Sequence, residues 1–242
     1  MKMYQKLILI FVILIYSNWI NGQPPFFNPL EEDVVKMAWN HAGNLLVVGY
    51  YSGEVSLFSQ NGDFLRAIRL YDYRITAMAW SPDDTKLIIS SGVGGGENIT
   101  VELWNTTNWV SQPIDYDSSD MITSFVWNPN NNYIHAGTLS FNSSHGKTFW
   151  VWDSNGQFID AFRKNTILGL SISPDGQRIA IGSDNIQIID ADTYEEIARF
   201  SSTDSYSVYE VTHFLWTPDS SELISANIHG TIQMWGINPS VP

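Results

Sequence analysis

The segment ITAMAWSPDD, residues 75–84, recurs along the chain with small changes, and this recurrence decides the fold. The related segments are VVKMAWNHAG from Val34, ITSFVWNPNN from Ile122, ILGLSISPDG from Ile167 and VTHFLWTPDS from Val211. The landmark position, Trp80 in the quoted segment, is filled in order by Trp39, Trp80, Trp127, Ile172 and Trp216. These residues are separated by 41, 47, 45 and 44 positions. A period of this length predicts a tandem array of similar β units.

Two further apolar strands follow each landmark. The second strands are LLVVG from Leu45, KLIIS from Lys86, YIHAG from Tyr133, RIAIG from Arg178 and ELISA from Glu222. The third strands are EVSLF from Glu54, TVELW from Thr100, TFWVWD from Thr148, NIQIID from Asn185 and TIQMW from Thr231. Their apolar residues alternate as in half-buried strands. Between the first two strands lies a turn of the Ser/Asn/Thr-Pro-Asp/Asn type, in which Pro fixes φ. A more variable fourth strand closes a unit.

The five copies resemble the WD-repeat (β-transducin-like) family. Only Trp152-Asp153 keeps the family's Trp-Asp dipeptide, and the usual Gly-His pair is absent from all five units. The resemblance implies an all-β propeller of four-stranded blades around a channel. Typical members hold each blade together with a buried set of hydrogen bonds between Asp, His, Ser and Trp. Because this set is not built here, we expect apolar packing to hold each blade. The expected domain covers residues 34–242, with blades at about 34–70, 71–117, 118–163, 164–203 and 204–242.

The strand count leaves the closure of the ring open. Five sets of three strands and four outer strands give nineteen, so the fifth blade lacks its outer strand. Residues 23–33 contain PPFFNPLEE, Pro24–Glu32, which could supply that strand because prolines are tolerated at a sheet edge. Phe26 and Phe27 would then pack on the fifth blade. The alternative is an open partial ring that is completed by a partner or by self-association.

The N-terminus has the pattern of an export signal. Residues 1–6 carry two basic side chains, Lys2 and Lys6, and no acid. The apolar run Leu7–Tyr16 that follows is unbroken but too short to span a bilayer. We expect residues 1–22 to be a signal peptide cleaved before Gln23, so that the mature chain is not inserted in a membrane. The expected location is secreted, periplasmic or extracytoplasmic, with an uncleaved anchor as the alternative.

Composition limits the function. The chain of 242 residues has 12 Lys and Arg against 25 Asp and Glu, a formal net charge of −13, and no cysteine. A strongly acidic protein repels phosphate backbones, so we predict no nucleic-acid partner. The absence of cysteine excludes disulfides, thiolate metal sites and a cysteine nucleophile.

No pattern in the sequence indicates catalysis. The five histidines lack the spacing of a metal pair, and the chain has neither a Gly-x-Ser-x-Gly elbow nor a Ser-x-x-Lys motif. His135 and His213 lie within strands and are predicted to be core or channel residues. The stretch Asp115–Asp120 could bind calcium weakly through its carboxylates, but a solvated acidic loop is the better interpretation. We therefore predict a non-enzyme with no cofactor and no metal.

Loops that connect successive blades carry tyrosine and aspartate, and in the family such loops lie on one face of the disc. Tyrosines give contact area at low entropic cost and are enriched in binding sites. The predicted partner-binding face consists of Tyr71, Asp72, Tyr73, Arg74, Asp115, Tyr116, Asp117, Asp204 and Tyr206. Three sequons, at Asn98, Asn105 and Asn142, would accept glycans in a eukaryotic secretory pathway.

The resemblance implies a non-catalytic scaffold that binds a protein partner. The alternative is a propeller that holds a small ligand or metal ion in its channel, or a hydrolase with channel carboxylates.

Overall fold

The computed structural model of the protein describes residues 33–93, 99–116, 120–140, 146–164, 166–183, 185–200 and 211–237. These residues form nineteen strands in five antiparallel sheets, in which each strand pairs with its neighbour along the chain. The first two sheets consist of β1 (Val34–Trp39), β2 (Leu45–Tyr50), β3 (Glu54–Ser59) and β4 (Phe64–Leu70), and of β5 (Ile75–Trp80), β6 (Lys86–Ser91), β7 (Thr100–Asn105) and β8 (Val110–Pro113).

The third and fourth sheets repeat this order. They consist of β9 (Met121–Trp127), β10 (Ile134–Leu139), β11 (Phe149–Trp152) and β12 (Phe158–Phe162), and of β13 (Gly169–Ile172), β14 (Arg178–Gly182), β15 (Ile186–Asp190) and β16 (Glu196–Phe200). The fifth sheet has three strands, β17 (Val211–Trp216), β18 (Glu222–Asn227) and β19 (Ile232–Gly236). Within the described residues, the predicted nineteen strands are found, and the fifth sheet has three strands where the others have four.

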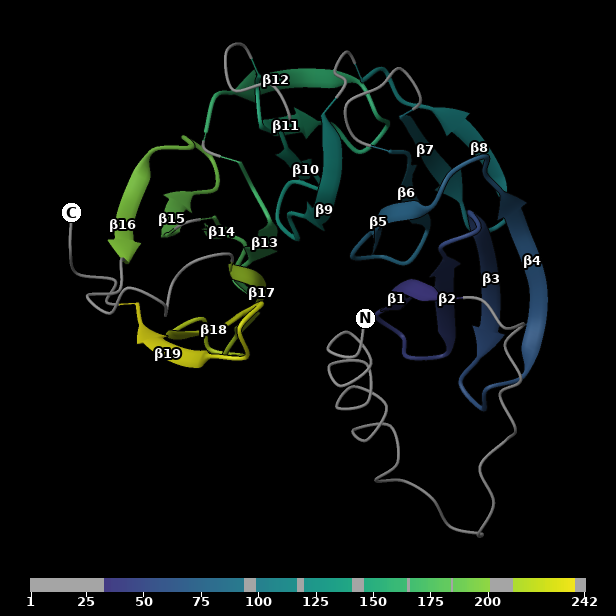
Figure 1. Cartoon of the computed structure of the whole chain (residues 1–242), viewed down its shortest axis with the longest axis horizontal. Coiled ribbons are helices and arrows are strands. Elements are labelled where there is room, and N and C mark those ends of the chain that lie inside the picture. Colours follow the sequence, from purple (N-terminus) through teal and green to yellow (C-terminus); the bar gives the residue numbers. More distant parts are fainter. Residues whose placement is uncertain are drawn as a thin grey trace, which may run out of the picture.

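The sheets stand side by side around an incomplete ring, with β1, β5, β9, β13 and β17 innermost (Figure 1). Each innermost strand packs against the next, from β1 through β5, β9 and β13 to β17. The ring is open between the fifth sheet and the first (Figure 1). Of the two alternatives left by the sequence, the described residues therefore adopt the open one. Residues 1–32, which include the expected signal peptide and the candidate closing strand, lie outside the described residues.

The landmark residues occupy equivalent places, as predicted. Trp39, Trp80, Trp127, Ile172 and Trp216 are the last residues of the five innermost strands. In each unit, the turn that follows is closed by a backbone amide that donates to the carbonyl of the residue after the landmark. In the second unit, the Asp84 amide donates to the Ser81 carbonyl at 2.9 Å, and the Ser81 hydroxyl accepts from the Lys86 amide at 2.9 Å. The same hydroxyl donates to Asp83 and lowers the pKa of that carboxyl.

The middle strands differ from the prediction of half-buried strands. In β3 and β7 the four central residues are all buried. Sheets that stack on both sides of a blade cover both of its faces, so alternating residues end up equally buried. The outer strands are the exposed ones, with Phe64, Val110 and Phe158 each about half or more exposed.

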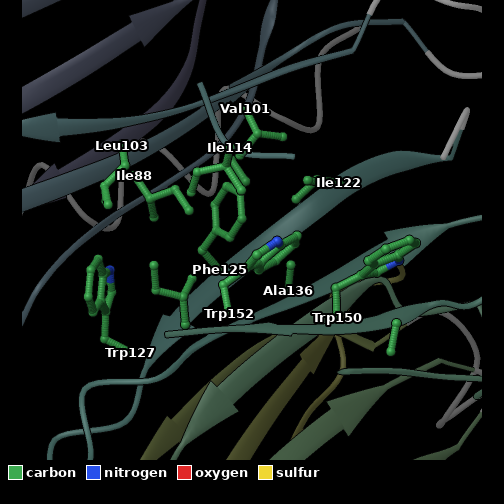
Figure 2. Packing of buried hydrophobic residues seen from close by; sticks show 13 residues of the cluster. Ile88, Val101, Leu103, Ile114, Ile122, Phe125, Trp127, Ala136, Trp150 and Trp152 are labelled. Carbon is green, nitrogen blue, oxygen red and sulfur yellow. The ribbon is translucent and has the colours of Figure 1, made fainter. Parts of the chain in front are cut away.

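The interface between the second and third sheets shows how the blades pack. Ile88 and Leu103 of the second sheet meet Phe125 and Trp152 of the third (Figure 2). Trp150 and Trp152 stack with their ring centroids 6.1 Å apart. Burial of large aromatic and branched side chains supplies most of the stability of such an interface.

One face of the fifth sheet is not covered by any other described sheet. Leu215, Ile224 and Met234 are opposite one another on β17, β18 and β19, and Ala226 pairs with Ile232 in the adjacent row. Leu215, Ile232 and Met234 are 65%, 70% and 61% exposed. The opposite face packs on the fourth sheet through Val211, Trp216 and Leu223. In the other sheets the equivalent face is covered by the next blade, so this exposure results from the opening of the ring.

Candidate binding site

A hollow of about 370 Å³ lies on the face of the disc where the innermost strands end. It draws residues from the first four units and is lined by His41, Trp80, Pro82, Val126, Trp127, Pro129, Ser171, Ile172, Ser173 and Pro174. Two indole rings and three prolines make its walls mainly apolar, with a few hydroxyl and imidazole groups among them.

Hydrogen bonds between neighbouring turns hold the hollow in shape. The amides of His41 and Ala42 donate to the Asp84 carboxylate at 2.7 and 2.8 Å. The Asn128 side chain donates to the Gly176 carbonyl at 3.1 Å, and Asn130 donates to the Asp175 carbonyl at 2.7 Å. The lining turns of neighbouring blades are therefore joined by hydrogen bonds.

Indole rings also join neighbouring blades beside the hollow. The Trp80 Nε1 donates to the Ala38 carbonyl at 3.0 Å, and the Trp127 Nε1 donates to the Ala79 carbonyl at 3.2 Å. Each acceptor immediately precedes the landmark residue of the preceding blade. The expectation that apolar packing alone holds the blades was therefore incomplete, because indole donors supply directional contacts between them.

The hollow contains one group of catalytic type. His41 Nδ1 lies 2.9 Å from Asp84 Oδ1, which is the pairing of a general base with its orienting carboxylate. Among the described residues, no serine hydroxyl forms a hydrogen bond with His41. The Ser173 hydroxyl instead donates to Asp175 at 2.5 Å. Among the described residues, the His41–Asp84 pair therefore has no hydroxyl nucleophile hydrogen-bonded to it.

The innermost strands carry two ionisable side chains, Lys36 of β1 and His213 of β17, and no carboxylate. The Lys36 Nζ donates to the Thr123 carbonyl of β9 at 3.3 Å, which links the first and third sheets. Surrounding protein atoms lower the pKa of Lys36, and the Arg74 charge lowers it further. Burial lowers the pKa of His213, and Lys36 adds to this effect. These five strands therefore carry none of the carboxylates that the alternative, a hydrolase with channel carboxylates, would require.

His135 is a core residue, since it lies fully buried on β10 between the rings of Phe149 and Tyr194. Burial lowers its pKa to about 3, which keeps the imidazole neutral. The described residues hold no group of three or more His, Asp or Glu side chains that could bind a metal ion.

Tyr71, the first residue of the predicted partner-binding face, is buried. Its hydroxyl donates to the Glu102 carboxylate at 2.7 Å and accepts from the Trp104 Nε1 at 3.2 Å. Burial raises the pKa of Tyr71, and the neighbouring Glu102 charge raises it further. The Tyr71 side chain therefore belongs to the interface between the first two blades and offers no contact area to a partner.

Other residues of that face do reach the surface. Asp72 and Asp115 are exposed, whereas Tyr73, Arg74 and Tyr116 are half-buried. The Arg74 guanidinium lies 5.8 Å from the centroid of the exposed Tyr51 ring, and it contacts the Met121 sulfur at 3.3 Å. Asp117, Asp204 and Tyr206 lie outside the described residues, as do the sequon residues Asn98 and Asn142. The third sequon residue, Asn105, is exposed at the end of β7.

The sequence analysis did not predict the hollow. Its lining comes from the turns of four units, so no single segment of the sequence signals it. Ile172, the one landmark residue that is not tryptophan, packs with Val126 and Tyr194 against the core between the third and fourth sheets.

Comparison with known proteins identifies the family. The family model described as eukaryotic translation initiation factor eIF2A matches residues 15–170, which is more than half of the chain. The chain belongs to this family. Together with the five repeated sheets and the relatives described next, this match places the chain among the WD-repeat β-propeller proteins.

Three curated proteins illustrate the relationship. The SIR4-interacting protein SIF2 of Saccharomyces cerevisiae is 38% identical over 72 residues, covering 30% of this chain and 12% of SIF2. The B-type cell cycle switch protein ccs52B of Medicago truncatula is 25% identical over 161 residues, covering 63% of this chain and 31% of that protein. WD repeat-containing protein 1 of Rattus norvegicus is 23% identical over 246 residues, covering 91% of this chain and 38% of that protein.

The matched segments thus span at most 38% of the length of these relatives. WD-repeat proteins typically act as scaffolds for interactions between proteins. Among the described residues, the structure contains no helix that is long and apolar enough to cross a membrane.

Proposed function

We propose that this protein is an exported, non-catalytic WD-repeat scaffold that binds a protein partner. The observation that carries the proposal is the hollow of about 370 Å³ at the ends of the innermost strands. Its lining of indole, proline and branched side chains favours the burial of apolar groups from a partner. The exposed rings of Pro129 and Pro174 at its margin leave it accessible to a polypeptide.

A binding role is favoured over a catalytic one by the site's chemistry. His41 and Asp84 are paired, but among the described residues no hydroxyl nucleophile is bonded to the imidazole. The name SIR4-interacting protein SIF2 describes a relative that binds another protein. The net charge of −13 favours a protein over a nucleic acid as partner. For the same reason, we do not extend the translation role in the family's description to this chain.

The exposed residues on the opposite face remain a second proposed contact surface. Asp72 and Asp115 are accessible there, with Tyr73, Arg74 and Tyr116 partly so. This surface differs in chemistry from the hollow, because it combines carboxylates with phenol rings. The two faces can therefore be tested separately.

Affinity capture from the native host tests the proposal with matched variants. The double variant Pro129→Glu/Pro174→Glu places two charges at the margin of the hollow, at exposed turn positions that tolerate substitution. The control Val110→Glu/Phe158→Glu places two charges at exposed positions on the outer strands, away from both faces. We expect the wild type and the control to retain one stoichiometric partner and the double proline variant to lose it. Equal capture by all three proteins, or no stoichiometric partner at all, would refute binding through the hollow.

Export is a separate part of the proposal. The basic residues Lys2 and Lys6, followed by the apolar run Leu7–Tyr16, support it. Mass spectrometry of the protein secreted by its host is expected to find an N-terminus near Gln23. Recovery of intact Met1 in a soluble cytoplasmic fraction would contradict export.

A further inference from the structure

Three basic side chains come from the beginnings of the innermost strands. Lys36 is on β1, His213 is on β17, and Arg74 immediately precedes β5. The side chains of Lys36 and His213 are accessible to solvent, and that of Arg74 is half-buried. The hollow lies where the same strands end, so these three residues belong to the other end of the ring.

Two of the basic groups contact β9 at neighbouring points. The Lys36 Nζ donates to the Thr123 carbonyl at 3.3 Å, and the Arg74 Nη2 lies 3.3 Å from the Met121 sulfur. Residues two apart along a strand are separated by roughly 7 Å, so the ammonium and the guanidinium are held close together. An ammonium has three N–H donors and a guanidinium has five. One carbonyl and one thioether sulfur therefore use only a small part of their donor capacity.

The three groups influence one another electrostatically. Burial lowers the pKa of Lys36, and the Arg74 charge lowers it further; burial also lowers the pKa of His213, and Lys36 adds to that effect. Among the described residues, no carboxylate forms an ion pair with any of the three, including those of Asp33 and Asp120, which precede β1 and β9. Like charges held together without an acid repel one another, and a bound anion relieves that repulsion.

The repeat shows that two of these residues are exceptional. Lys36 and His213 are the third residues of their repeat segments, and each follows an irregularity in the pairing of its strand. In the three middle units the same position holds Ala77, Ser124 and Gly169. The repeat therefore places basic side chains at this position in the first and fifth units, which border the opening of the ring (Figure 1).

We propose that Lys36, Arg74 and His213 form a binding site for the phosphate group of a small ligand. A guanidinium can bind two phosphate oxygens at once, and an ammonium can bind a third. The Thr212 hydroxyl lies 2.8 Å from the His213 Nδ1, so Nε2 is the ring nitrogen that can donate to a ligand. These donors outnumber the two oxygens of a carboxylate, which favours phosphate.

The acidic net charge of the chain is compatible with such a site. A long polyanion such as a nucleic acid meets the field of the whole surface, whereas a small ion inside the ring meets chiefly the charges that surround it. The proposal is also independent of the hollow and of its protein partner. Phosphate binding and partner capture are measured separately, and either can fail without the other.

Titration of the full-length, isotope-labelled protein with inorganic phosphate, followed by NMR, tests the proposal. At millimolar phosphate we expect saturable shifts of the amide resonances of Lys36, Met121 and Thr123 and of the imidazole resonances of His213. Chloride at the same ionic strength should cause none, and acetate should bind about tenfold more weakly because it accepts fewer charge-assisted hydrogen bonds. Glycerol phosphate distinguishes the sources: tighter binding than inorganic phosphate indicates an organic phosphate, and weaker binding indicates the free ion.

Two double variants make the test specific. Lys36→Met/Arg74→Gln removes two charges from the site, and Lys147→Met/Arg66→Gln removes the same two charges from exposed positions before β11 and on β4. The site variant is expected to bind phosphate at least tenfold more weakly, and the control is expected to bind as the wild type does. Phosphate should raise the unfolding temperature of the wild type and the control but not that of the site variant.

Several results would overturn the proposal. These are an absence of saturable shifts at Lys36 and Thr123 with millimolar phosphate, equal effects of phosphate and chloride, equal affinity for acetate, and an equal loss of binding in the two double variants. If the site variant does not fold, the shift map and the ranking of the anions in the wild type still decide the outcome.

Discussion

The Tyr71 hydroxyl donates a 2.7 Å hydrogen bond to the Glu102 carboxylate inside the interface between the first two blades. Tyr71 is 5% exposed and Glu102 9%, so the hydroxyl satisfies a buried acid that would otherwise have few partners. Arg69 lies 3.9 Å from the other carboxylate oxygen and is itself half exposed. This contact couples two blades through a polar pair in a largely apolar interface.

Tyr71→Phe is expected to lower the free energy of unfolding by about 1–3 kcal/mol, because it leaves the buried carboxylate without its donor. The raised pKa of Tyr71 adds a dependence on alkaline pH. Above pH 10 the unfolded chain loses the phenol proton while the folded chain keeps it, so stability falls as pH rises. Urea unfolding between pH 8 and 11 measures both effects, with Tyr51→Phe as an exposed control. A slope in Tyr71→Phe as steep as in the wild type would contradict this account.

His135 is predicted to make the protein sensitive to mild acid. Its pKa is lowered to about 3 by burial, whereas an unfolded histidine titrates near 6.5. The unfolded chain therefore binds the proton first, and stability is lost as pH falls from about 6.5 towards 3. At pH 4.5 the expected loss from this residue is about 2–3 kcal/mol.

Unfolding of His135→Leu across the same pH range isolates this contribution. The variant should show a flatter profile between pH 6.5 and 4.5, whatever its stability at pH 7, and the exposed His229→Gln should match the wild type. A wild-type profile that is flat in this window would show that His135 is not buried as a neutral imidazole.

The landmark tryptophans are predicted to be major contributors to stability. Trp127→Ala should cost about 3–5 kcal/mol, the usual range for a large buried aromatic residue. Trp127→Phe should cost less, because it keeps most of the ring and loses chiefly the bond to the Ala79 carbonyl. Denaturant unfolding of these variants and of the Trp80 and Trp216 equivalents tests the repeat. Three tolerated Trp→Ala changes, each below about 1 kcal/mol, would disprove the equivalence.

The open ring predicts association between copies of the chain. Ile232 and Met234 are exposed on β19, which is the edge of its sheet in the described structure. Apolar faces and unpaired strand edges favour contacts between chains. Light scattering should show concentration-dependent association of the wild type and its loss in Ile232→Lys/Met234→Lys, whereas Phe64→Lys on β4 should behave as the wild type.

Deletion of Pro24–Glu32 separates this account from closure by the chain's own N-terminus. If that segment forms the missing outer strand, its removal should lower stability and increase association. If the ring is open in solution, the deletion should have little effect, since the edge of β19 is already exposed. A wild type that stays monomeric at high concentration would contradict the prediction of self-association.

The repeat made the number, order and type of the strands predictable, because a fixed period averages out the ambiguity of any single segment. Side-chain burial was harder to predict. Tyr71 follows β4 directly and resembles any tyrosine at a strand end, and its burial depends on Glu102, which comes from a different blade. The hollow depends in the same way on contacts between the turns of four units, which no single segment of the sequence reveals.

Site-specific photo-crosslinking in the native host tests the central claim most directly. A photoreactive phenylalanine analogue is placed at Pro174, on the exposed margin of the hollow, and in a second protein at Phe64 on the outer surface. Binding through the hollow predicts one protein that is crosslinked from position 174 and absent from position 64. The same crosslinks from both positions, or none from position 174, would contradict the claim that the hollow binds a protein partner.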